Sequence, residues 1–160
     1  MSIAITSIGA KVSFAFEETK GVRPTAGYKH IPGIKEIPEM NPSPDSLETT
    51  SLDNLQYRTY VDGLKDLGGA LGFLTNFSQD LYDLYNGSDG ISAKWKTSKA
   101  AGLQMYLCVD IQGLGESCYI SVIPSELGLP PASVNSVMDI TLYFTPAGEP
   151  EWDEDPEYAE

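Results

Sequence analysis

The sequence predicts a mainly β domain: an antiparallel β-sandwich or barrel with one or two flanking helices and a long proline-rich assembly loop. Three observations lead to this fold class. Short segments of alternating apolar and polar residues recur, no regular strand–helix–strand order links them, and the 160 residues include 15 glycines and 11 prolines, which indicate many turns. A chain of this length can close one hydrophobic core. We therefore expect one domain over residues 1–148, followed by an acidic tail over residues 149–160.

The first predicted strand lies within residues 10–16. Apolar side chains at Ala10, Val12, Phe14 and Phe16 alternate with their neighbours, a period of two that indicates a strand covered on one face.

Residues 21–46 form the predicted extended loop. Five prolines in this stretch exclude a helix and a central strand: Pro24, Pro32, Pro38, Pro42 and Pro44. A loop this long is uncommon in a compact domain and is usually functional or disordered. Disordered segments are poor in large apolar residues, whereas this one contains Ile31, Ile34, Ile37 and Met40. We therefore expect a partner subunit to order it.

The middle of the chain predicts a strand and two helical stretches. A short strand starts at Leu47, residues 57–66 are turn-rich, and alternation over residues 67–77 indicates a second clear strand. Ser78 is a suitable N-cap for a short helix, and a weaker helical pattern runs from Ile91 towards Gly102.

Residues 105–112 and 118–123 predict a β-hairpin that pairs Val109 with Ile120 and Leu107 with Val122. In that register Cys108 and Cys118 lie on opposite faces, about 10 Å apart along the strand, too far for a disulfide. Two free thiols are expected. A last strand over residues 137–144 shows the cleanest alternation, with Met138, Ile140, Leu142 and Phe144 on its apolar face.

The charge of the chain argues against several classes of partner. A formal net charge of -13 repels phosphate backbones and anionic lipids, so sequence-specific nucleic-acid binding and membrane binding are not expected. The first 16 residues also lack the pattern of a secretion signal. Seven carboxylates and no base lie in residues 149–160, which we expect to form a flexible outer tail.

No pattern in the sequence indicates catalysis, a cofactor or a metal. The single histidine, His30, cannot make a multi-histidine site, and the two cysteines have no ligands at metal-binding spacing. No serine or cysteine sits in a nucleophile motif, and the glycines of residues 68–72 lack the end of a phosphate loop. We therefore predict that the protein is not an enzyme, with no catalytic, cofactor-binding or metal site.

Four ordered motifs resemble the major tail tube proteins of long-tailed bacteriophages of Gram-positive hosts. They are residues 31–38 (IPGIKEIP), 44–53 (PDSLETTSLD), 60–68 (YVDGLKDLG) and 140–150 (ITLYFTPAGEP). The resemblance implies a β-sandwich related to type VI secretion tube proteins, which forms hexameric rings that stack into a tail tube for DNA ejection. The implied partners are the chain itself, the tape-measure protein, the tail terminator and distal tail proteins, and DNA only in transit. The implied location is the virion tail, assembled in the host cytoplasm.

The resemblance and the exposed edges of antiparallel sheets together predict residues for self-assembly. These are Ile34, Ile37, Pro38, Met40, Leu47, Thr49, Tyr57 and Tyr60.

Two other function classes remain open from the sequence. A monomeric β-sandwich that binds carbohydrate or protein would share the strands and would show exposed aromatic residues with little self-association. A small acidic hydrolase would place two carboxylates with separated pKa values in one pocket.

Overall fold

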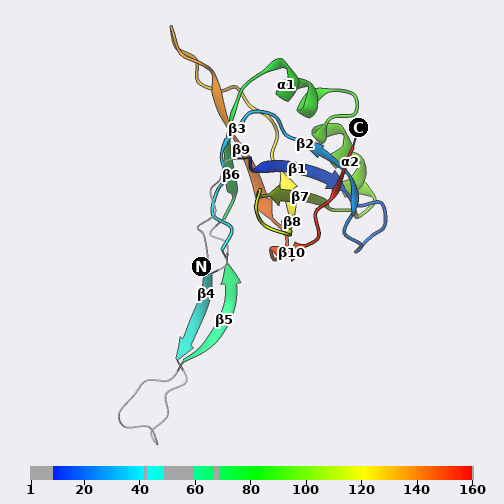
Figure 1. The fold of residues 1–160 in the computed structure, drawn as a ribbon, viewed down its shortest axis with the longest axis vertical. Coiled ribbons are helices and arrows are strands. Elements are labelled where there is room, and N and C mark those ends of the chain that lie inside the picture. Colours follow the sequence, from blue (N-terminus) through cyan, green and yellow to red (C-terminus); the bar gives the residue numbers. More distant parts are fainter. Residues whose placement is uncertain (1–8, 42, 49–59, 67–68, 160) are drawn as a thin grey trace, which may run out of the picture.

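The computed structural model describes residues 9–41, 43–48, 60–66 and 69–159, and its fold is mainly β, as predicted. Two short helices, α1 (Gln79–Asn86) and α2 (Ile91–Ala100), lie between the sixth and seventh strands (Figure 1). The strands are β1 (Lys11–Phe16), β2 (Ala26–His30), β3 (Ile34–Glu36), β4 (Ser43–Glu48), β5 (Tyr60–Asp66), β6 (Leu71–Asn76), β7 (Met105–Asp110), β8 (Ser117–Pro124), β9 (Asp139–Pro146), β10 (Glu151–Asp153) and β11 (Glu157–Tyr158).

Nine strands form one strongly curled sheet in the order β11-β2-β1-β7-β8-β9-β6-β3, with β10 also paired to β8. All these pairs are antiparallel except β11 with β2. The two halves of β8 have different partners on the same edge: its first residues pair with β10 and its last residues pair with β9. β4 and β5 form a separate two-stranded sheet.

The main core lies between one face of the curled sheet and the two helices. Alternate side chains of the central strands are buried there, including Val12, Leu107 and Ile120, and they meet Leu81 and Tyr85 of α1. The α1 helix begins where predicted, because the Ser78 hydroxyl accepts a hydrogen bond from the Leu81 amide. The predicted second helix and the strands over residues 67–77 and 137–144 are also present, as α2, β6 and β9.

The opposite face of the sheet carries a second, smaller cluster. Ala15 of β1, Tyr28 of β2, Cys108 of β7 and Tyr119 of β8 are all buried there. The prediction that the first strand is covered on one face was therefore wrong, because β1 is buried on both. The tyrosine rings explain this: Tyr28 and Tyr119 pack edge to face, with centroids 5.7 Å apart.

The predicted hairpin exists as β7 and β8, but its register differs from the prediction by two residues. Val109 lies opposite Cys118 and Leu107 opposite Ile120. A shift of two keeps every side chain on its expected face, because the side-chain period of a strand is two. Cys108 and Cys118 are accordingly free and on opposite faces, as predicted, and both are buried.

Both thiols are expected to stay reduced and unreactive in the native protein. Burial raises the pKa of Cys108 to about 11 and also raises the pKa of Cys118, so little thiolate exists at neutral pH. Intact mass with and without reductant should be identical, whereas a disulfide would remove about 2 Da. Iodoacetamide should label the cysteines only after denaturant is added. Fast labelling of the native protein, or a mass change on reduction, would contradict the burial of these groups.

Two predictions about the first half of the chain were wrong. Residues 21–46 are not one loop, because β2, β3 and β4 lie within them, and the turn-rich stretch at residues 57–66 contains β5. Pro24, Pro32 and Pro38 fall between strands, where the missing N–H breaks no ladder. Pro44 lies inside β4, whose only partner among the described residues is β5, so one of its edges can accommodate a proline.

Candidate assembly surfaces

The β4–β5 hairpin extends away from the body of the protein and forms one end of its long axis (Figure 1). Its strands are joined through pairs that run from Ser43 with Asp66 to Glu48 with Tyr60. A two-stranded sheet is only marginally stable in water by itself. Among the described residues the hairpin pairs with no other strand, so it is a candidate surface for contact with another molecule.

The segment between β8 and β9 projects at the other end of the long axis (Figure 1). It carries three apolar side chains that are almost fully exposed: Leu129 at 91%, Val134 at 89% and Val137 at 75%. The segment holds its shape through local contacts, since the hydroxyls of Ser133 and Ser136 are hydrogen-bonded and Asn135 takes up a left-handed turn. Three such exposed side chains within nine residues make the segment a candidate interaction surface. The sequence predicted no interaction surface in this segment.

The structure separates the residues predicted for self-assembly into three groups. Ile34, Ile37 and Met40 are half-buried and pack against the chain's own main core, and Pro38 is also half-buried. The chain therefore covers these apolar side chains itself, where a partner subunit was expected to order the stretch. Leu47 and Tyr60 lie on the paired strands of the projecting hairpin, whereas Thr49 and Tyr57 lie outside the described residues. The assembly role of all eight stays a prediction.

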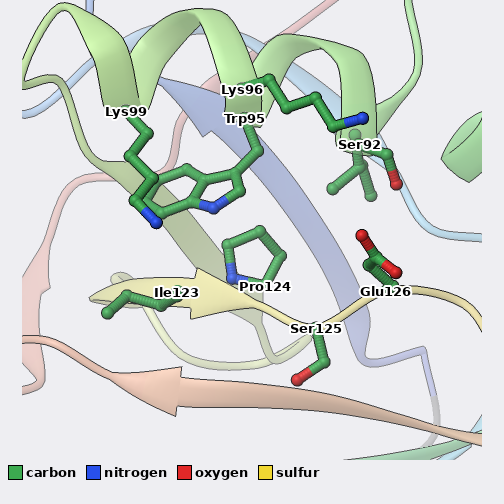
Figure 2. Close-up of a pocket in the computed structure, with 9 residues that line it drawn as sticks. Ser92, Trp95, Lys96, Lys99, Ile123, Pro124, Ser125 and Glu126 are labelled. Carbon is green, nitrogen blue, oxygen red and sulfur yellow. The ribbon is translucent and has the colours of Figure 1, made fainter.

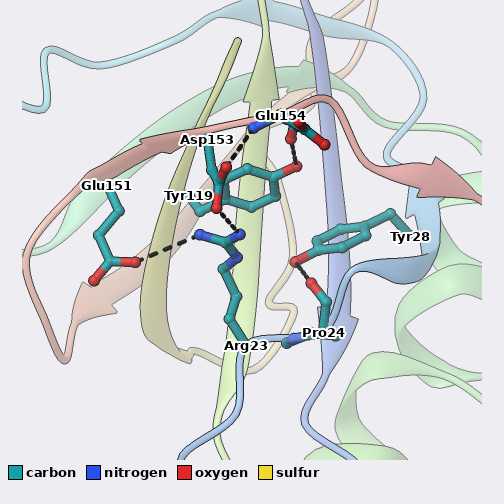
Figure 3. Close-up of polar contacts among 7 residues, drawn as sticks. All are labelled: Arg23, Pro24, Tyr28, Tyr119, Glu151, Asp153 and Glu154. Carbon is teal, nitrogen blue, oxygen red and sulfur yellow. Dashed lines mark hydrogen bonds and ion pairs between the residues drawn. The ribbon is translucent and has the colours of Figure 1, made fainter.

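The acidic C-terminal segment is anchored to the sheet, so the expectation of a flexible outer tail was wrong. Arg23 makes ion pairs with Asp153 and, at 3.5 Å, with Glu151 (Figure 3). Its guanidinium also stacks on the Tyr119 ring, 4.3 Å from the centroid. The Tyr119 hydroxyl in turn donates to the Glu154 carbonyl, and the hydrogen bond from Arg23 lowers the pKa of Asp153.

The same segment covers the outer edge of β2. β11 pairs with β2 in parallel, the Ala159 amide donates to the Tyr28 carbonyl at 2.8 Å, and the Tyr158 hydroxyl donates to Asp110 at 3.0 Å. An uncovered strand edge is a template for pairing with another chain. The C-terminal segment therefore decides whether the β2 edge is open to a neighbour.

Replacing Arg23 with methionine should loosen this segment while the core stays folded. The substitution keeps the hydrophobic stem and removes both ion pairs, so the amides of residues 151–159 should exchange with solvent faster than in the parent protein. Acid should act in the same way: the folded pKa of Asp153 is depressed, so its stabilising contribution is present above the ordinary aspartate pKa and is lost as the pH falls below it. Both effects are measured by hydrogen-exchange protection factors at neutral pH and near pH 3, because protection factors correct for the slower intrinsic exchange of amides in acid. Unchanged exchange in Arg23→Met would show that strand pairing alone holds the segment.

Ionisable groups in the described part of the chain do not gather into a metal site. No three His, Cys, Asp or Glu side chains there come together, and His30 is exposed at the end of β2. Among the described residues, no helix has the length and apolar character needed to cross a membrane.

Comparison with known proteins gives a fold relationship. No family model matches the sequence, and no curated protein matches it. Among solved structures, the fold is similar to a chain in the cryo-EM structure of the anti-feeding prophage baseplate, 6-fold symmetrised. The match has a TM-score of 0.59 at 10% sequence identity and covers 96% of this chain and 98% of that chain. At this identity the likeness shows that the two chains share a fold over nearly their whole length.

Proposed function

We propose that the protein is a structural subunit of a phage tail or phage-tail-like particle. The observation that carries this proposal is the fold match with a chain of a sixfold-symmetrised prophage baseplate, which extends over 96% of this chain. In its finer form, the proposal is that copies join into hexameric rings that stack as a tail tube, the conduit for DNA ejection.

Two features of the molecule support repeated association. The hairpin and the β8–β9 segment are unlike surfaces at opposite ends of the long axis, so contact between them joins copies head to tail. The curled sheet ends in two different strands, β11 and β3, so edge contacts between copies also join unlike surfaces. Head-to-tail contacts of this kind either close into rings or continue as filaments. A tube of stacked rings needs one set of contacts that closes each ring and a second set that continues from ring to ring.

The remaining roles follow from the tube. Its partners would be its own copies, the tape-measure protein, the tail terminator and distal tail proteins, with DNA only passing through. Its place would be the virion tail after assembly in the host cytoplasm. Such a subunit needs no catalysis and no cofactor, and we propose that it is not an enzyme.

Negative-stain electron microscopy of the purified protein, over a range of concentrations, tests the proposal. Rings or tubes with sixfold symmetry are the expected result. Particles that stay monomeric at all concentrations, checked by analytical ultracentrifugation, would contradict it and favour a monomeric binding module.

A single change in the β8–β9 segment should weaken stacking, since we place this segment at the axial contact between rings. Val134→Asp places a charge on a side chain that is 89% exposed, so folding should be unaffected, but the charge would be buried at an axial contact. We expect shorter tubes or single rings in the microscope. Val22→Asp is the matched control, because Val22 is also exposed, at 57%, but lies in a different loop. Tubes of parental length from Val134→Asp would exclude this segment from the axial contact.

A further inference from the structure

A groove of about 380 Å³ lies between α2 and the segment that follows β8. Trp95 faces Pro124 across it, and Lys99 lies at the end near Ile123 (Figure 2). Lys96 lies towards the other end, where Glu126 is placed. Trp95 and Pro124 are half-buried, whereas Ile123 is 44% exposed. The groove thus combines an apolar floor with a rim of two ammonium groups and one carboxylate.

The charge of α2 is unusual for this protein. The helix carries Lys94, Lys96 and Lys99 and no acidic residue, in a chain with 23 acidic and 10 basic residues. Lys96 and Lys99 are exposed, and within the described ranges neither has a carboxylate partner within 4.0 Å. A ligand of this groove should therefore be acidic and carry an apolar group for the floor.

The C-terminal segment of a second copy has this chemistry. Residues 149–157 contain six carboxylates and no basic side chain. They also include Trp152, whose side chain is 55% exposed. Strand pairing holds the middle of the segment away from the groove of its own chain. β10 pairs it with residues 117–119 of β8, whereas the groove is built on residues 123–126. Five residues of strand, from Cys118 to Ile123, separate the two sites by roughly 16 Å.

We propose that the groove between α2 and the end of β8 is a contact between copies, and that it receives the acidic segment 149–157 of a second copy. The proposal deepens the proposed function by assigning one of its contacts. Because the groove and the segment are different surfaces of one molecule, each copy offers one of each and the contact repeats from copy to copy. The segment stays paired with its own sheet and presents its outer side chains, which include Glu149 and Trp152, both exposed.

Two charge-reversal variants test the contact. The groove variant is Lys96→Glu with Lys99→Glu, and the segment variant is Glu149→Lys with Glu154→Lys. All four side chains are exposed, and the two glutamates are not the ion-pair partners of Arg23, so folding should be unchanged. Lys20→Glu with Lys94→Glu is the control for the groove variant, since it makes the same change in net charge outside the groove lining.

Each variant alone is expected to need a concentration higher by roughly tenfold or more for association, because like charges then meet at the contact. An equal mixture should restore part of the association, since the acidic groove of one variant meets the two ammonium groups introduced in the other, and the unchanged lysine groove of the second variant meets the unchanged acidic segment of the first. Sedimentation velocity measures association, and carbodiimide cross-linking of the parent protein should join Lys96 or Lys99 of one copy to residues 149–157 of another. Mixed isotope labels identify the links between copies.

The outcomes separate this inference from the proposed function. If the parent protein forms tubes, but the groove variant associates as well as its control or the mixture is not restored, the groove contact is wrong and the tube proposal stands. If cross-links and restoration occur in small oligomers but no ring or tube ever forms, the contact is right and the tube proposal fails. A parent protein that does not associate at all overturns both.

Discussion

Leu142→Asp is expected to abolish the native fold. Leu142 lies in β9, is 2% exposed and belongs to the main core. Aspartate there would lose the packing of a leucine and bury a carboxylate that has no partner, a combination that costs about 4–5 kcal/mol or more. That cost is a large share of the stability of an ordinary domain. Near-ultraviolet circular dichroism and urea titration should show loss of the cooperative transition.

The neighbouring residue provides the control for this prediction. Tyr143 is 52% exposed on the other face of the same strand, so Tyr143→Asp should leave the unfolding midpoint nearly unchanged. Equal tolerance of both substitutions would mean that the faces of β9 are assigned wrongly.

Removing the projecting hairpin should abolish tube formation and leave a folded body. Ser43 and Asp66 are paired across the base of the hairpin, so a short glycine–serine linker in place of residues 43–66 can close the gap with little strain. Among the described residues β4 and β5 pair only with each other, in a sheet separate from the main one, so cooperative unfolding of the body should persist. We expect electron microscopy of this variant to show no tubes.

A shuffled hairpin is the control for the excision. In this variant the polar residues of β4 and β5 are exchanged and the length of the strands is kept. It therefore distinguishes the loss of a specific contact from the loss of the hairpin's volume. Tubes of normal length from the excised protein would remove the hairpin from the assembly contacts, whatever the shuffled protein does.

The alternation of apolar and polar residues predicted strands correctly wherever one face of the strand packs on the main core. β6 and β9 were predicted within a few residues because Phe73 and Leu142 point into the core and their neighbours do not. The faces of β7 and β8 were also correct despite a register error of two, since the period of a strand does not change under that shift. The turn between β7 and β8 sets their register, and the residues of that turn do not specify its geometry clearly.

Prediction failed where structure depends on partners distant in the chain. β2 and β3 are short and lie among prolines, and they become strands because β1 and β6 offer them edges. In the sequence, the C-terminal segment shows only a run of acidic residues. In the structure, Arg23 anchors it from about 130 residues earlier in the chain. The apolar tip of the β8–β9 segment was missed for a different reason: exposure is a property of the fold, and a valine in a loop looks the same whether it is covered or not.

The central position of β1 has a consequence for the kinetics of folding. β1 pairs with β2 on one side and with β7, roughly ninety residues later, on the other. After β2, β1 therefore waits for four further strands and two helices to be synthesised before β7 can satisfy its second edge, and β2 waits for β11. A domain of such high contact order folds on the millisecond-to-second scale, and its open edges are exposed to neighbouring nascent chains during that time. A chaperone that covers these edges on the nascent chain would therefore protect folding more than one that binds the folded domain.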